Sequence, residues 1–147
     1  MSGFVTEWGR KAADLYATDY ARRYREHDNQ LGNVDAYRAF CGWLHEICGR
    51  FDAPIDALDL GCGTGRYFSA LRNINRLVGL DASAPMLAEA AHPVAASRIS
   101  ARIVELVQGD ALTYEFPDDS FDLIYSIGVL AESKKMKRDS SDRTSEF

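Results

Sequence analysis

The sequence predicts an α/β fold, in which a sheet of parallel strands is flanked by helices and preceded by a helical N-terminal segment. Two observations carry this prediction. After residue 54, short apolar runs alternate with helix-like stretches, which is typical of parallel strands joined by helical crossovers. The first apolar run also ends in the turn Gly61-Cys62-Gly63-Thr64-Gly65, whose glycines suit a tight junction between a strand and a helix.

The N-terminal segment, residues 1–54, predicts two helices. Residues 7–28 are rich in helix formers and contain no proline, so they predict one continuous helix. Three tyrosines recur on it at four-residue spacing, and they fit core packing as well as they fit a ligand contact: Tyr16, Tyr20 and Tyr24. A second helix is expected to begin after Asn33 as its N-cap and to end near Gly49.

The core segment, residues 55–132, predicts four strands with helical connections. The strands are expected at 55–60, 76–81, 103–108 and 121–127. The connections are expected to be a helix after the glycine turn over 66–73, a helix from Ser83 with Pro85 in its first turn to about Ala91, and a short helical linker over 94–102.

The last segment, residues 133–147, differs in composition. It holds only two apolar residues, Met136 and Phe147, among charged and polar ones, which predicts disorder. The sequence therefore divides into three parts: a helical lid or cap (1–54), a ligand-binding core (55–132) and a polar tail (133–147).

Composition narrows the functional classes. With 147 residues the chain can form one domain with a real core. A net charge of −5 argues against a nucleic-acid partner held by overall charge. The chain has no run of about 18 apolar residues and no apolar signal core at its start, so we expect no membrane contact and a cytoplasmic location. The three cysteines lack the spacing of a zinc site.

Three carboxylates at or next to the ends of the predicted strands, Asp59, Asp81 and Asp110, indicate a nucleoside cofactor. Asp81 ends the second strand, where a carboxylate can accept both hydroxyls of a ribose. Asp110 ends the third strand and can accept the exocyclic amine of an adenine, while Met86 can pack on the adenine face. A nicotinamide dinucleotide is the competing cofactor, but its GxGxxG fingerprint places the third glycine where this chain has Arg66. Asp59 also lies where a dinucleotide-binding strand is usually apolar.

Four segments together resemble the class I S-adenosylmethionine-dependent methyltransferases: residues 57–67, 78–90, 107–112 and 121–130. The resemblance implies a Rossmann-like sheet, S-adenosylmethionine as cofactor and a small-molecule methyl acceptor. It assigns no catalytic residue. It places the cofactor against Tyr20 in a lid helix and against Asp59, Gly61, Cys62, Gly63, Gly65, Asp81, Ala82, Met86, Asp110, Ala111, Ser126 and Ile127.

Family members usually continue beyond the fourth strand, so the resemblance also implies that this chain is truncated. The fourth strand would then be an apolar sheet edge, which a second copy could cover in a homodimer. The alternative to an active small-molecule methyltransferase is a non-catalytic fragment that binds the cofactor, or only a partner, and lacks the acceptor pocket.

Overall fold

The computed structural model describes residues 4–31 and 34–127, and it confirms the predicted α/β class. Four parallel strands form one sheet in the order β3-β2-β1-β4. Their bounds are Ile55–Leu60 for β1, Ile74–Asp81 for β2, Ile103–Gln108 for β3 and Leu123–Tyr125 for β4. Because all four run the same way, the residues that follow them meet at one edge of the sheet.

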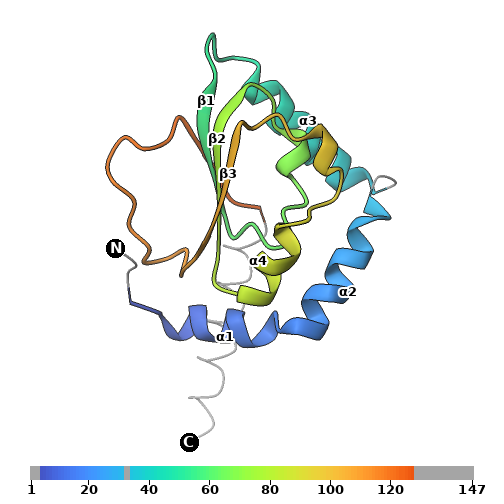
Figure 1. The fold of residues 1–147 in the computed structure, drawn as a ribbon, viewed down its shortest axis with the longest axis vertical. Helices are drawn as coiled ribbons and strands as arrows, with labels where there is room; N and C mark the ends of the chain where they lie inside the picture. Colours follow the sequence, from blue (N-terminus) through green and yellow to red (C-terminus); the bar gives the residue numbers. More distant parts are fainter. Residues whose placement is uncertain (1–3, 32–33, 128–147) are drawn as a thin grey trace, which may run out of the picture.

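The α-helices gather on one side of this sheet and beyond its carboxyl end (Figure 1). They are α1 (Glu7–Leu15), α2 (Thr18–Asp28), α3 (Asp35–Cys48) and α4 (Ala84–Ala90). Two short 3₁₀ helices, η2 (Phe68–Ala70) and η3 (Ala96–Arg98), precede β2 and β3. α1 lies across the carboxyl ends of the strands in Figure 1, so the N-terminal segment covers the edge where ligands bind in such sheets.

The prediction of one helix over residues 7–28 is wrong, because the helix breaks after Leu15. Tyr16 and Ala17 leave the helical conformation, and the carbonyl oxygen of Tyr16 accepts a hydrogen bond from the hydroxyl of Ser83. This long-range bond replaces a helical one and turns α2 away from α1. No local pattern signals it, because helix propensity is high on both sides of the break.

The helix predicted over 66–73 is also wrong, since only the single turn of η2 forms there. Gly65 takes a left-handed φ of 72°, and the chain then directs Phe68 into the interior, where it is fully buried. The remaining differences are smaller. β2 begins at Ile74 instead of Arg76, the linker over 94–102 contains only η3, and β4 is shorter than predicted. Asn33 and the polar tail lie outside the described residues.

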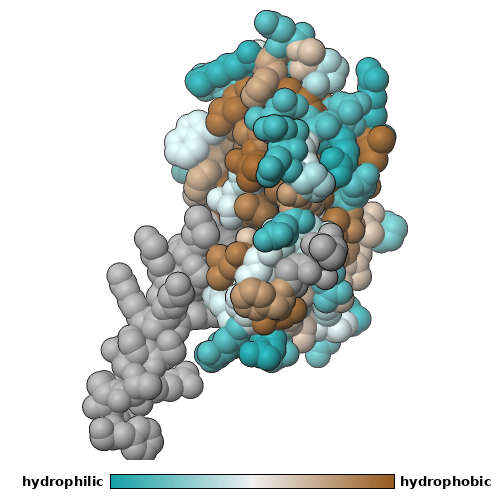
Figure 2. All heavy atoms as spheres, turned by 90° about the vertical axis from the view of Figure 1, so that its left-hand side faces the viewer, coloured by the Kyte–Doolittle hydropathy of each residue, from teal (hydrophilic) through white to brown (hydrophobic). Residues whose placement is uncertain are grey.

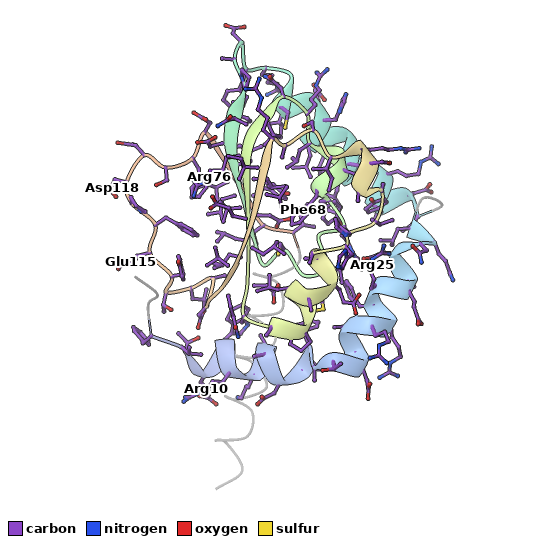
Figure 3. The ribbon with its side chains drawn as sticks, in the orientation of Figure 1. Arg10, Arg25, Phe68, Arg76, Glu115 and Asp118 are labelled. Carbon is purple, nitrogen blue, oxygen red and sulfur yellow. The ribbon has the colours of Figure 1, made fainter. Side chains whose placement is uncertain are left out.

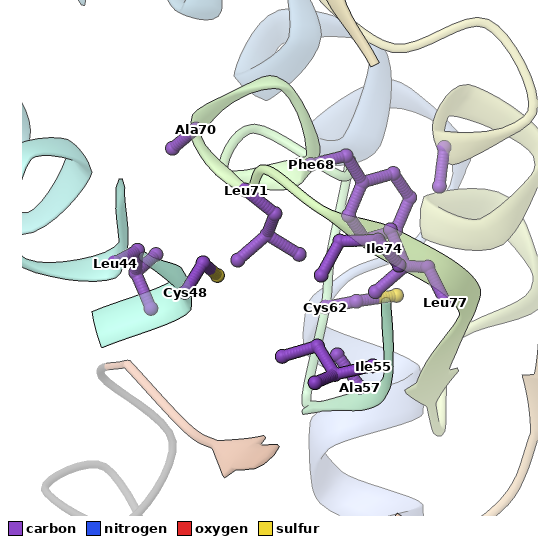
Figure 4. Close-up of a cluster of buried hydrophobic side chains, with 11 residues drawn as sticks. Leu44, Cys48, Ile55, Ala57, Cys62, Phe68, Ala70, Leu71, Ile74 and Leu77 are labelled. Atoms are coloured by element: carbon purple, nitrogen blue, oxygen red, sulfur yellow. The ribbon is translucent and has the colours of Figure 1, made fainter. Parts of the chain in front are cut away.

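One hydrophobic core lies between the sheet and the helices (Figure 4). Leu44 and Cys48 of α3 face Ile55 and Ala57 of β1, and Phe68 fills the space between them and β2. Figure 3 shows Phe68 directed inward, whereas charged residues such as Arg10 lie at the periphery. This core fixes β1 against α3 and so fixes the point at which the glycine turn begins.

Within residues 4–31 and 34–127, the opposite face of the sheet is covered by the connection between β3 and β4 and not by a helix. Leu58, Val78 and Leu80 are buried there beneath aromatic residues of the connection, Tyr114, Phe116 and Phe121. Figure 2 views the molecule from this side and shows hydrophobic surface among hydrophilic side chains. Ile124 of β4 is in register with Leu58 and stays 57% exposed, so the cover stops short of β4.

Within the described residues, no helix is both long and apolar enough to cross a membrane. The same residues contain no group of three or more His, Cys, Asp or Glu side chains placed to hold a metal ion.

Candidate functional site at the carboxyl end of the sheet

The glycine turn after β1 forms the floor of the candidate site. Gly61, Gly63 and Gly65 have φ angles of 75°, 55° and 72°, a left-handed region that disfavours side chains. The amides of Gly61 and Cys62 donate to the carbonyl oxygen of Leu80, at 2.7 and 2.9 Å, and tie the turn to the end of β2. The pattern of three glycines therefore reflects backbone geometry as well as space for a ligand.

Gly65 and Cys62 of the glycine turn have mainly structural roles. A Cβ atom on Gly65 would lie 2.6 Å from the ring of Phe68, so only glycine fits there. The side chain of Cys62 is buried in the core and packs beneath Gly79. Its burial raises the pKa of the thiol well above the usual value, because the thiolate would lose its hydration.

Asp81, at the end of β2, joins the two loops that border the site. Its Oδ2 accepts the amide of Gly63 at 2.8 Å, and its Oδ1 accepts the amide of Ser83 at 2.9 Å. Ser83 in turn caps α4 by accepting the amide of Met86. The predicted Ser83 cap is thus confirmed, and the carboxylate holds the glycine turn and α4 in register.

A cavity lies above this floor, between the strand ends and the N-terminal helices. Gly61, Gly63, Asp81, Ala82, Met86, Ala111 and Ile127 line it from the core segment, and Trp8, Ala12, Tyr16 and Tyr24 line it from α1 and α2. We call it the central cavity. It collects seven of the thirteen residues that the sequence predicts for the cofactor, contributed by the ends of all four strands.

A second cavity, which we call the side cavity, continues past the glycine turn toward α2. Its lining comprises Tyr24, Asp59, Gly61, Cys62, Gly63, Arg66, Tyr67 and Ile127. The two cavities share the glycine turn, Tyr24 and Ile127, so together they follow β1 around its end.

Asp59 is the buried carboxyl group of the side cavity, at 3% exposure. Burial raises its pKa to about 7; the nearby Tyr125 hydroxyl lowers the pKa and the charge of Asp81 raises it. The geometry between Asp59 and Tyr125 falls short of a hydrogen bond, and Asp59 Oδ2 has no hydrogen-bond partner among the described residues. An unpaired acceptor of this kind is costly in a protein interior unless a ligand completes it.

Asp110 is engaged by the N-terminal segment. The amide of Thr6 donates to its Oδ2 at 2.8 Å, the Thr6 hydroxyl donates to the same oxygen, and the amide of Leu112 donates to Oδ1 at 2.9 Å. Gly9 allows this approach, because a Cβ atom there would lie 2.3 Å from Asp110 Oδ2. α1 thus docks its first turn on the carboxylate that the sequence predicts for adenine.

Four predicted site residues lie outside the lining of the two cavities: Asp110, which Thr6 engages, and Tyr20, Gly65 and Ser126. Tyr20 is 38% exposed and stacks on Tyr24, so the second tyrosine of the series faces away from the central cavity. Gly65 faces Phe68. Ser126 donates its hydroxyl to the carbonyl of Leu60 at 2.9 Å, which ties β4 to β1 beside the site.

Sequence reasoning missed the contributions of α1 and of the buried pair between α2 and the glycine turn. Trp8, Ala12 and Tyr16 share the four-residue spacing of the tyrosines, and this longer stripe is the signal that could have extended the lid to α1. The other missed feature is the ion pair of Arg66 with Asp28, 2.8 Å long, in which Asp28 is buried. No spacing rule links residues 28 and 66.

A family model described as a methyltransferase domain matches residues 57–140, more than half of the chain. The chain belongs to this family. Demethylmenaquinone methyltransferases are among its curated relatives. The protein from Lactiplantibacillus plantarum is 41% identical over 102 residues, 65% of this chain and 43% of the relative. The protein from Geobacillus stearothermophilus is 30% identical over 107 residues, which are 67% of this chain and 44% of that relative. The chain thus spans less than half the length of these relatives.

Solved methyltransferase structures have the same fold. CalS10, an amino pentose methyltransferase from Micromonospora echinaspora solved with bound S-adenosylmethionine, is 26% identical with a TM-score of 0.51. The match covers 77% of this chain and 43% of CalS10. A second solved structure is that of a Methanococcus maripaludis protein described as a putative S-adenosylmethionine-dependent methyltransferase. The match covers 88% of this chain and 55% of the Methanococcus chain. Its TM-score is 0.60 at 22% identity, which supports the fold alone.

Proposed function

We propose that this chain binds S-adenosylmethionine in the central and side cavities and forms the donor-binding half of a small-molecule methyltransferase. The observation that carries the proposal is the cavity floor itself. There, a left-handed glycine turn after β1 and a carboxylate after β2 face one space that Met86 closes from α4. A nucleoside with an amino-acid arm matches this arrangement: a ribose for Asp81 and an arm that follows the glycine turn.

The residues divide between the parts of the donor. Asp81 would accept the ribose hydroxyls, and Ala82, Met86 and Ala111 would border the adenine. Gly61 and Gly63 would allow the amino-acid arm to approach the backbone, and Asp59 would accept its ammonium group in the side cavity. Ile127, which lines both cavities, would lie near the sulfonium. The bound donor supplies an activated methyl group, so these residues position it and exclude water.

Asp110 requires a change of partner in this proposal. Its Oδ2 already accepts two hydrogen bonds from Thr6, so an adenine amine would have to share or replace them. Binding of the donor would then be linked to movement of the first turn of α1.

We further propose a small molecule as the methyl acceptor. The relatives above are named for demethylmenaquinone, and CalS10 is described as an amino pentose methyltransferase. Both names denote small acceptors, which supports the class and leaves the compound open. The second candidate is a module that binds the donor without transferring its methyl group, and the same two cavity linings would fit it.

The outer edge of β4 supports a proposal about assembly. Within the described residues β4 pairs only with β1, and Ile124 is exposed beside that edge. We propose that two copies associate along this edge, because an unpaired apolar strand favours pairing with another chain.

Calorimetric titration of the full chain with S-adenosylmethionine tests the donor proposal. We expect binding by the wild type and at least about tenfold weaker binding by Asp81→Asn, since the amide keeps one acceptor and loses the charge that strengthens both hydrogen bonds. Asp118→Asn, on an exposed turn, is the matched control and should bind like the wild type. Absence of heat with the wild type at high micromolar donor would overturn the proposal. Added acceptor then separates the enzyme from the binding module, because only the enzyme forms S-adenosylhomocysteine.

A further inference from the structure

Among the described residues, Arg66 is the one cationic residue in the lining of the side cavity, and Asp59 belongs to the same lining. Arg66 follows the glycine turn directly, and its backbone carbonyl accepts the hydroxyl of Tyr37 of α3 at 2.9 Å. Its side chain is only 17% exposed, so most of the guanidinium is removed from bulk water. A guanidinium desolvated this far needs partners on every side, because its donors are costly to leave unmade.

The partners of Arg66 within the described residues leave part of this need unmet. One terminal nitrogen lies 2.8 Å from Asp28 Oδ1, and the guanidinium carbon lies 4.0 Å from the centroid of the Tyr24 ring. The Nε and Nη2 atoms are buried, and neither has a hydrogen-bond partner among the described residues, so the contact of Nη2 with Asp28 is an ion pair only. The side chain is thus held by one ion pair and one aromatic ring face, and part of its hydrogen-bonding capacity is unused.

Asp28 determines where the guanidinium sits. Its side chain is fully buried at the end of α2, and its other oxygen accepts the hydroxyl of Thr64 in the glycine turn. One carboxylate therefore joins α2, the turn and Arg66. Because these contacts fix the rotamer of Arg66 before a ligand arrives, ligand binding costs little side-chain entropy at this arginine.

We infer that Arg66 binds the α-carboxylate of the donor's amino-acid arm, and that Asp28 and Tyr24 are positioning residues that present the guanidinium to it. The inference rests on the proposed function and adds the anionic half of the subsite. A cavity whose lining includes both an acidic residue, Asp59, and a cationic residue, Arg66, matches a zwitterion, and the donor's arm carries both an ammonium and a carboxylate group. Guanidinium and carboxylate groups also form paired, charge-assisted hydrogen bonds.

Two ligands separate this role from a structural one. S-adenosylhomocysteine has the amino-acid arm, whereas 5′-methylthioadenosine has the same nucleoside and thioether without it. We expect Arg66→Gln to weaken S-adenosylhomocysteine binding by about 10- to 100-fold while 5′-methylthioadenosine binding changes by less than about twofold. Asp28→Asn, which keeps the acceptor for Thr64 and removes the charge, should shift the two ligands in the same selective way by a smaller factor. Arg66→Lys should restore part of the loss.

Arg50→Gln is the matched control, because Arg50 forms an exposed ion pair with Glu46 on α3 and lies outside both cavity linings. Equal weakening of both ligands by Arg66→Gln and Arg66→Lys would overturn the inference and assign Arg66 to folding of the turn. Unchanged binding of S-adenosylhomocysteine by Arg66→Gln would overturn it as well. Failure of the wild type to bind either ligand would instead overturn the proposed function, so the two failures are distinguishable.

Discussion

At the scale of single residues, Asp59 shows how burial changes the chemistry of a carboxyl group. The strand β1 carries it into the interior, and it belongs to the lining of the side cavity. Burial favours the neutral carboxyl group and raises its pKa to about 7. A cationic group in the cavity would favour the ionised form, so ligand and proton should compete at this residue.

Asp59 should also make the stability of the protein depend on pH. Its pKa is near 4 in the unfolded chain and about 7 in the folded one, so between these values the folded state binds the extra proton. The contribution is therefore complete below about pH 4 and is lost as the pH rises toward 7, by up to about 4 kcal/mol. Urea unfolding at about pH 5 and pH 8 should show a drop for the wild type that Asp59→Asn reduces. An unchanged drop in Asp59→Asn would contradict this origin, and Asp118→Asn serves as the control.

At the scale of elements, α1 is the part of the candidate site whose position the sequence predicts least well. Its fold depends on contacts far along the chain, from Thr6 to Asp110 and from Tyr16 to Ser83. Thr6 has two tasks, since its hydroxyl also accepts the amide of Gly9 as the N-cap of α1. Docking of α1 on the sheet and formation of its first turn are therefore coupled.

Replacement of Thr6 by alanine should loosen α1. Loss of an N-cap costs about 1 kcal/mol, and the hydroxyl contact with Asp110 is lost as well. Hydrogen exchange of α1 amides should therefore accelerate by about fivefold or more, while amides of α3 stay protected. Donor binding should become tighter, because the adenine amine then meets one competitor fewer at Asp110. Weaker binding would show that the Thr6 contact persists in the complex; Thr18→Ala, on the exposed first turn of α2, is the control.

At the scale of the whole molecule, the sheet is covered unequally. Helices pack on one face, and the connection between β3 and β4 packs on the other with its aromatic side chains. That cover reaches Leu58 and Val78 and leaves Ile124 exposed. On this face of the sheet, the cover therefore leaves Ile124 of β4 exposed.

Association through this edge should be sensitive to charge on β4. We expect Ile124→Lys to shift the protein toward monomer in light scattering after size exclusion, because lysine on an edge strand opposes pairing. Val34→Lys changes another exposed apolar residue, which lies away from the sheet, and should leave the mass unchanged. A wild type that stays monomeric at high concentration would rule out the association.

The strands and the glycine turn could be predicted from the sequence because local patterns encode them. β1 and β3 begin and end where the apolar runs do, and Ser83 caps α4 as its position next to Pro85 predicts. The helix break at Tyr16 and the end of helical structure after Gly65 could not be predicted from the sequence. The first depends on the distant hydroxyl of Ser83, and the second depends on the buried space that Phe68 occupies.

The same division holds within the site. Carboxylates at strand ends, such as Asp81, lie where parallel topology brings them together, so spacing along the chain was enough to predict them. Asp28 meets Arg66 only because α2 folds back over the glycine turn. A pair with no periodic relationship can be found only once the fold is known.

The position of α1 has a kinetic consequence. α1 lines the central cavity, and a ligand that enters past this helix has to release its first turn from Asp110 and its C-cap residue Tyr16 from Ser83. If release of these two contacts is slower than diffusion into the cavity, the observed association rate will level off as ligand concentration rises, at the rate of helix opening. A product that leaves by the same opening would in that case be released at the rate of helix opening, and this rate would then limit turnover.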